Sequence, residues 1–192
     1  MNTKGMVLAA LFAALVAVLG LMPPIPTPIT PVPITAQTLG VMLAGGFLGM
    51  KLGGISMGLF VLLVAAGAPL LAGGRGGLGV IASPTGGFFL SWPIIAMFIG
   101  WAVERMWNSL TTLKLFFINV VIGMLLIYLI GATYQSWITG VPLTVTLLGT
   151  TSFLIGDSLK AAAAAILIMQ VKSLSPINER KHEPKNQTAE AA

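Results

Sequence analysis

Long apolar segments constrain what this chain can fold into more than any other feature. A helix that crosses the roughly 30 Å hydrocarbon core of a bilayer needs about 20 mostly apolar residues. Six segments come close to or exceed this length: residues 5–22, 35–50, 53–70, 88–107, 115–134 and 145–171. Their apolar residues are continuous and do not alternate as in a membrane barrel. The sequence therefore predicts an all-α membrane protein with six transmembrane helices.

Composition and charge placement support this fold class. Only 8% of the residues are charged, against about 25% in soluble domains, and the mean hydropathy is +0.97. Basic residues gather at alternate segment ends and beyond the last segment, namely Lys4, Lys51, Arg105, Lys114, Lys172, Arg180, Lys181 and Lys185. This is the positive-inside pattern. It places both termini in the cytoplasm, in contact with membrane lipid, and does not form a groove for nucleic acid.

One transmembrane domain followed by a polar tail is expected on this basis. Residues 1–172 would form the six-helix transmembrane domain. Residues 173–192 are polar, contain two prolines and show no periodicity, so we expect a disordered cytoplasmic tail.

The last apolar segment contains the only acid and the only base deep in any of the six. Each of Asp157 and Lys160 would cost on the order of 2.5–3.5 kcal/mol in hydrocarbon. Residues three apart share a helix face, so the two side chains present an acceptor and a donor together. Such residues usually face a polar cavity and bind something. The alternative is an intrahelical ion pair that only fixes packing.

Several classes of activity are excluded by what the chain lacks. It has no cysteine, its one histidine is His182 in the tail, and Asp157 is the one carboxylate deep in the apolar segments. A pair of catalytic carboxylates, a histidine-based triad and an ordinary metal site therefore have no residues to build them. We expect no enzyme, no catalytic residue, no metal and no cofactor. The G-x-G-x-x-G letters at 74–79 follow no strand, and Lys51 lies in no phosphate loop.

Three further segments are candidates for function. Six prolines between residues 23 and 33 impose a stiff, extended chain, which we interpret as a lid over a pocket or else as a connector on the membrane surface. Arg75 lies in a glycine-rich outer loop, where it could meet a ligand carboxylate or a lipid headgroup. Ala9, Ala13 and Ala17 lie four apart in the first segment, which allows close helix approach. They would contact either a partner membrane protein or the rest of the bundle.

Three motifs occur in order along the chain. They are PITAQTLGV at 33–41, Gly-Gly-Arg-Gly-Gly at 73–77 followed by Pro-Thr-Gly-Gly-Phe at 84–88, and Gly-Asp-Ser-Leu-Lys at 156–160. Together they resemble the BioY family, the biotin-specific S components of energy-coupling factor transporters. The resemblance covers about residues 5–171. It departs from the family pattern at Ser83, at Phe88 and at the start of the glycine-rich loop, which lacks an asparagine.

The resemblance implies an S-component bundle in the bacterial cytoplasmic membrane that captures external biotin. It implies ligand contacts from Asp157 and Lys160, a lid in the first outer loop and a docking face on the first helix. Energy would come from ATP hydrolysed by two partner ATPases through a membrane coupling subunit. Our candidate residues are, for substrate, Asp157, Lys160, Arg75, Gly74, Gln37, Thr85 and Gly86; for the lid, Pro28, Ile29, Thr30 and Pro31; and for docking, Ala9, Ala13 and Ala17. The alternatives are an S component for another vitamin and a proton-coupled carrier.

Overall fold

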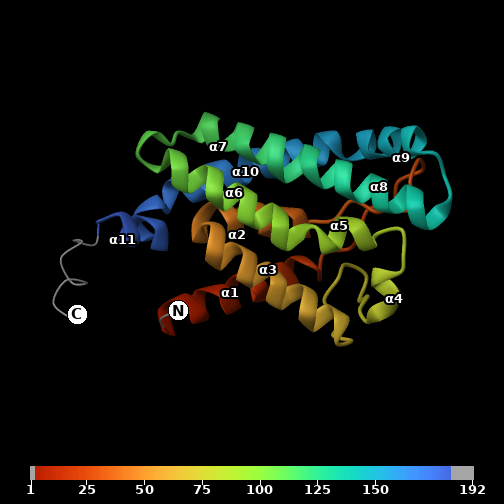
Figure 1. Cartoon of the computed structure of the whole chain (residues 1–192), viewed down its shortest axis with the longest axis horizontal. Coiled ribbons are helices and arrows are strands. Elements are labelled where there is room, and N and C mark those ends of the chain that lie inside the picture. Colours follow the sequence, from red (N-terminus) through yellow and green to blue (C-terminus); the bar gives the residue numbers. More distant parts are fainter. Residues whose placement is uncertain (1–2, 183–192) are drawn as a thin grey trace.

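The computed structural model describes residues 3–182, and every regular element in this range is helical (Figure 1). Extended pairing in the described range is limited to two isolated antiparallel bridges, Ile25 with Ile34 and Leu71 with Arg75. The prediction of an all-α fold is confirmed for these residues.

Most of the helices follow one another with short connections, whereas residues 20–36 join α1 to α2 and residues 66–77 join α3 to α4. The first half contains α1 (Thr3–Leu19), α2 (Gln37–Leu48), α3 (Met50–Ala65), α4 (Leu78–Ile81), α5 (Gly86–Leu90), α6 (Trp92–Met106) and the 3-10 turn η1 (Trp107–Ser109). The second half contains α7 (Thr112–Ile118), the π-helical stretch η2 (Asn119–Leu126), α8 (Ile127–Thr139), α9 (Leu143–Gly149), the 3-10 turn η3 (Thr150–Phe153), α10 (Leu154–Gln170), the 3-10 turn η4 (Lys172–Leu174) and α11 (Pro176–His182).

Two continuous helical rods dominate the second half. Thr112–Thr139 and Leu143–Gln170 have 28 residues each and are long and apolar enough to cross a membrane. Three shorter apolar helices, α1 to α3, belong to the first half, and α2 packs on α10. Large apolar side chains are exposed along both rods, including Leu129 and Ile155, which are 53% and 80% exposed. In water such exposure would be unfavourable, whereas lipid accommodates it.

The predicted helix at 88–107 is divided in the structure. The α5 helix ends at Leu90 and α6 begins at Trp92. Between them the Ser91 hydroxyl donates to the Phe88 carbonyl at 2.7 Å. Pro93 has no N–H to donate, so it fits the first turn of a helix and not its middle. Pro93 therefore lies in the first turn of α6.

Glycines allow the first-half helices to approach closely. Helix α3 packs on α6, and α2 packs on both. A Cβ atom added at Gly100 of α6 would lie 2.3 Å from the carbonyl carbon of Gly49. Gly49 itself has φ +84, which side chains with a Cβ rarely adopt, and it forms the turn between α2 and α3. The backbone of α6 at Gly100 therefore lies directly against the backbone of the turn at Gly49.

The prediction of a disordered tail is wrong for residues 173–182, which include the packed helix α11. Helix α11 packs across the ends of α2 and α6, with Ile177 only 1% exposed. The Ser175 hydroxyl donates to the Phe47 carbonyl at 2.6 Å. The Arg180 guanidinium donates to the Leu48 carbonyl at 3.1 Å and to Glu104 at 2.9 Å. These donors satisfy carbonyl groups that a helix end leaves unpaired. The rest of the predicted tail, residues 183–192, lies outside the described residues.

Different elements of the chain lie at the two ends of the bundle. Figure 1 shows the start of α1 and α11 together at the left end, and Lys4 pairs there with Glu179. At the right end lie α4, α9 and the proline-rich segment between α1 and α2. The functional candidates in loops are therefore all at the end away from α11.

The contact between Gly100 and Gly49 gives a test of this packing. We predict that Gly100→Ala lowers the free energy of unfolding by about 1–3 kcal/mol or more, because the added methyl meets backbone that cannot move aside. Gly58→Ala in α3 is the matched control, since its Cβ would meet nothing within 4 Å. We expect it to be neutral or slightly stabilising. Thermal unfolding in detergent measures both. Equal midpoints for the two variants would contradict this packing.

Candidate functional site

A pocket lies between the two halves of the bundle. It takes in about 600 Å³ of space, a figure that includes the solvent at its open mouth. Its walls come from the residues before α2, from α2 itself, the glycine-rich loop, α5, α6, α8, η3 and α10. The lining residues are Val32, Pro33, Ile34, Thr35, Gln37, Thr38, Leu71, Arg75, Thr85, Phe88, Phe89, Trp92, Ile127, Tyr128, Phe153, Asp157 and Lys160.

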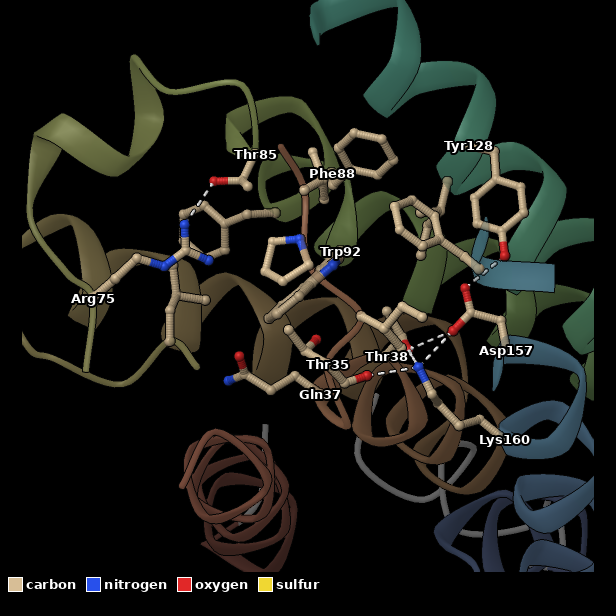
Figure 2. Close-up of a pocket in the computed structure, with 17 residues that line it drawn as sticks. Thr35, Gln37, Thr38, Arg75, Thr85, Phe88, Trp92, Tyr128, Asp157 and Lys160 are labelled. Atoms are coloured by element: carbon tan, nitrogen blue, oxygen red, sulfur yellow. Dashed lines mark hydrogen bonds and ion pairs between the residues drawn. The ribbon is translucent and has the colours of Figure 1, made fainter. Parts of the chain in front are cut away.

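Asp157 is at the centre of a hydrogen-bond network at one side of this pocket (Figure 2). Its Oδ1 accepts from Lys160 Nζ at 2.6 Å and from Thr38 Oγ1 at 3.2 Å. Its Oδ2 accepts from the Tyr128 hydroxyl at 2.6 Å. A carboxylate has about four acceptor positions. Three are occupied by these protein donors, so one position at Oδ2 is left for a ligand N–H.

Lys160 uses all of its donors within the protein. Besides Asp157, its Nζ donates to the Thr35 carbonyl at 2.6 Å and to Thr38 Oγ1 at 3.0 Å. An ammonium group has three N–H bonds. The resemblance implies a ligand contact from Lys160. In this structure its donors hold Asp157 and the start of α2.

Burial makes this network sensitive to the loss of either charge. The side chains of Asp157 and Lys160 are 8% and 15% exposed. Buried ions need both a partner and further hydrogen bonds to offset their desolvation. The pair has both, with Thr35, Thr38 and Tyr128 supplying the additional contacts.

Tyr128 is a site residue that sequence reasoning missed. It is 5% exposed and lies just after the π-helical stretch Asn119–Leu126. A π turn takes in more residues than an α turn, so the helix face of a residue beyond it does not follow the 3.6-residue period. The available signal was a tyrosine hydroxyl within an apolar segment, which usually needs a hydrogen-bond partner.

Arg75 and Thr85 form the other polar side of the pocket. The Arg75 Nε donates to the Ala72 carbonyl at 3.2 Å, and its Nη1 donates to Thr85 Oγ1 at 3.4 Å. Among residues 3–182 no carboxylate pairs with Arg75. Its guanidinium therefore keeps donors for an anionic group.

Gln37 lines the pocket, but its amide binds the protein. Its Nε2 donates to the carbonyls of Val16 and Leu70 at 3.1 and 3.0 Å, and its Oε1 accepts from the Ala72 N–H at 3.0 Å. These bonds join α1, α2 and the glycine-rich loop. Gln37 thus places Arg75 indirectly, through Ala72.

Two glycine candidates do not line the pocket. Gly74 is exposed with φ +69, which fits a tight turn. Gly86 is buried, and a Cβ there would lie 2.0 Å from the Ile81 carbonyl oxygen. The structure gives these glycines roles in the turn and in packing.

The proline-rich segment borders the pocket with its last residues. The predicted lid residues Pro28, Ile29, Thr30 and Pro31 do not line it, whereas Val32 and the residues that follow do. Reciprocal 2.9 Å hydrogen bonds between Ile25 and Ile34 fold the segment back on itself. Its tip is attached to α8, because the Gln135 Nε2 donates to Thr30 Oγ1 at 3.3 Å.

The predicted docking alanines face the bundle. Ala9 and Ala13 are 2% and 4% exposed, and the Ser56 hydroxyl of α3 donates to the Ala9 carbonyl at 2.8 Å. Ala17 is half-buried. The prediction that Ala9 and Ala13 form an exposed docking face is wrong, and the alternative of packing within the bundle holds. The alanines exposed on α1 are Ala10 and Ala14.

Comparisons with known proteins agree on one family. The model of the BioY family matches residues 1–176. The biotin transporter BioY of Rhizobium etli is 44% identical over 172 residues, 87% of this chain and 92% of that protein. The probable biotin transporter BioY of Bacillus subtilis is 46% identical over 162 residues, 84% of this chain and 87% of that protein. A crystal structure of the S-component for biotin from an ECF-type ABC transporter matches with a TM-score of 0.86 and 31% identity, over 90% of this chain and 95% of that one.

The buried ion pair gives a test by paired substitution. We predict that Lys160→Met alone lowers stability by about 3–5 kcal/mol, because it leaves Asp157 charged and without a counter-ion. The double variant Asp157→Asn/Lys160→Met should be more stable than Lys160→Met. Thermal unfolding of the detergent-solubilised proteins measures the difference. Strict additivity of the single effects would contradict a coupled pair.

The exposed pair Lys4–Glu179 provides the matched control for this experiment. Its side chains are 58% and 52% exposed. We expect Lys4→Met to change stability by at most about 1 kcal/mol, since water screens such pairs.

Proposed function

Because the chain belongs to the BioY family, we propose that it is the membrane subunit that captures external biotin for uptake. It is a substrate-binding transporter subunit and not an enzyme, as the names of its relatives indicate. The observation that carries the proposal is the ion pair Asp157–Lys160, which lines an open pocket between the helices instead of facing lipid.

Biotin fits the distribution of polar groups in this pocket. Its ureido ring has two N–H donors and a carbonyl, and one of these donors would take the open position at Asp157 Oδ2. Charge-assisted hydrogen bonds of this kind are among the strongest in a dry site. The sulfur-containing bicycle and the aliphatic chain would lie against apolar walls that include Phe88, Ile127 and Phe153. The ligand carboxylate would meet the remaining donors of Arg75.

The membrane orientation belongs to the same proposal. We place six spans in the bacterial cytoplasmic membrane with both termini inside, in contact with lipid. The basic residues near α11 and the start of α1 support this orientation through the positive-inside rule. The pocket mouth and the proline-rich segment would then face the exterior.

The proline-rich segment would act as the lid, with its tip attached to α8 by a hydrogen bond. Thr30 carries the bond to Gln135, and Val32 to Thr35 border the ligand. Movement of the tip would therefore change the pocket wall directly, while the Ile25–Ile34 bridge keeps the segment intact.

Energy for uptake would come from other subunits. The sequence has no phosphate loop, and we propose no cofactor for this chain. A coupling membrane subunit with two ATPases would use ATP and dock on the exposed face of α1. That face carries Ala10 and Ala14 together with Leu11 and Val18, which are 58% and 60% exposed. Small residues four apart let a partner helix approach closely.

Binding measurements test the ligand and the site together. Purified protein should bind biotin in calorimetric titration, and other vitamins should not compete. Asp157→Asn should weaken binding at least about tenfold through loss of a charge-assisted bond. Lys160→Ala should do the same by releasing Asp157. Lys114→Ala, exposed and outside the pocket, should bind as the native protein does. Undiminished binding in both pocket variants would refute the site.

Transport measurements test the docking face separately. We predict that Ala10→Trp or Ala14→Trp keeps biotin binding but stops uptake with the energising subunits, because the bulky ring keeps a partner helix away. Val121→Trp is the control, at a 56% exposed position on the stretch between α7 and α8. It should transport normally. Normal uptake by Ala14→Trp would place the docking face elsewhere.

A further inference from the structure

A tryptophan in the pocket wall has an unused hydrogen-bond donor. Trp92, at the start of α6, is 5% exposed and lines the pocket. Its indole Nε1 is buried and has no hydrogen-bond partner among residues 3–182. Buried indole N–H groups usually find a partner, and an unmade hydrogen bond costs roughly 1–3 kcal/mol. A ligand acceptor would remove this cost, since the described part of the chain supplies none.

Aromatic neighbours fix the orientation of this indole. The rings of Phe60 and Phe89 both lie 5.6 Å from the Trp92 ring, centroid to centroid, and the Phe89 ring meets it edge to face at 80°. Phe60 is 0% exposed and Phe89 is 2% exposed, so neither can move aside easily. The N–H direction is therefore set before any ligand arrives, which lowers the entropy cost of using it.

The unused N–H lies in the middle of the pocket. Figure 2 shows the Trp92 nitrogen between Arg75 and Thr85 on one side and Asp157 and Lys160 on the other. The wall of the pocket is largely apolar and includes Phe88, Phe89 and Phe153. A ligand that spans the two polar sides must pass this donor.

The Asp157 network leaves a ureido carbonyl without a donor. All three N–H bonds of Lys160 are used, and the Tyr128 hydroxyl is donated to Asp157. Thr38 Oγ1 also donates to Asp157. A ureido ring bound to Asp157 through N–H therefore finds no free donor for its oxygen in that network. Arg75, on the opposite side, is the group for the carboxylate.

We propose that the Trp92 indole N–H donates to the ureido carbonyl oxygen of the bound ligand and so selects for a ring that carries this oxygen. The inference rests on the proposed function, since it assumes that biotin occupies this pocket. Asp157 would then accept a hydrogen bond from a ureido N–H, and Trp92 would donate one to the carbonyl oxygen of the same group. One N–H and the carbonyl oxygen of the same ureido group would be recognised from two different helices, α10 and α6.

Ligand titrations with Trp92→Phe test this assignment. The variant keeps an aromatic ring but loses the N–H, and we expect it to bind biotin roughly five- to tenfold more weakly. Protonated 2-iminobiotin replaces the carbonyl oxygen by a donor, so the variant should bind it no more weakly than the native protein does. Biotin methyl ester keeps the carbonyl, so the loss should persist. The matched control is Trp107→Phe, a buried tryptophan outside the pocket whose N–H already has Asn178 as a partner. It should bind biotin normally.

Three titration results would overturn the assignment. They are unchanged biotin binding by Trp92→Phe, an equal loss for all three ligands, and a loss that disappears with the methyl ester. The second would mean that the ring only packs, and the third that the N–H meets the carboxylate.

Proton NMR of the native protein with ¹⁵N-labelled tryptophan adds a second measurement. Its result does not depend on whether the Trp92→Phe variant folds correctly. Biotin should shift the Trp92 indole N–H signal downfield by more than that of Trp107. An unmoved Trp92 signal in a sample that binds biotin would refute this inference alone, whereas no binding at all would refute the proposed function.

Discussion

An ion pair inside an apolar bundle is the interaction on which the rest of this structure depends. Asp157 and Lys160 would each be unfavourable in hydrocarbon, and they are stable there because Thr35, Thr38 and Tyr128 complete their hydrogen bonds. This requirement brings the start of α2, the start of α8 and the first turns of α10 to one point. The same point forms one side of the pocket, so the stability of the bundle and the ligand binding that we propose depend on the same atoms.

The other half of the molecule provides a fixed frame for this network. Glycine contacts such as Gly49 with Gly100 let α2, α3 and α6 pack backbone to backbone. Gln37 then joins α1, α2 and the glycine-rich loop by three hydrogen bonds. Arg75 is held opposite Asp157 as a result. The pocket thus has two polar sides of different chemistry, separated by aromatic and aliphatic walls, which suits an elongated ligand with a polar ring and a charged end.

The sequence predicted the fold class and the central pair because both depend on strong, local signals. Hydropathy marks apolar helices, and Asp157 and Lys160 share a face through their spacing alone. Tyr128 was missed because the π-helical stretch before it shifts the helix face. The burial of Ala9 and Ala13 was not foreseen, because a run of alanines does not show which side of the helix meets α3. The helix after residue 175 was missed because its stability comes from contacts with Phe47, Leu48 and Glu104, distant in sequence.

An experimental structure of the protein with biotin would test the central claim most directly. The account predicts that the ureido ring lies within hydrogen-bond distance of the Asp157 carboxylate while Lys160 still holds that carboxylate. The ligand carboxylate should lie at Arg75. A biotin molecule bound elsewhere, or an Asp157–Lys160 pair that faces lipid or is closed off from the ligand, would contradict it.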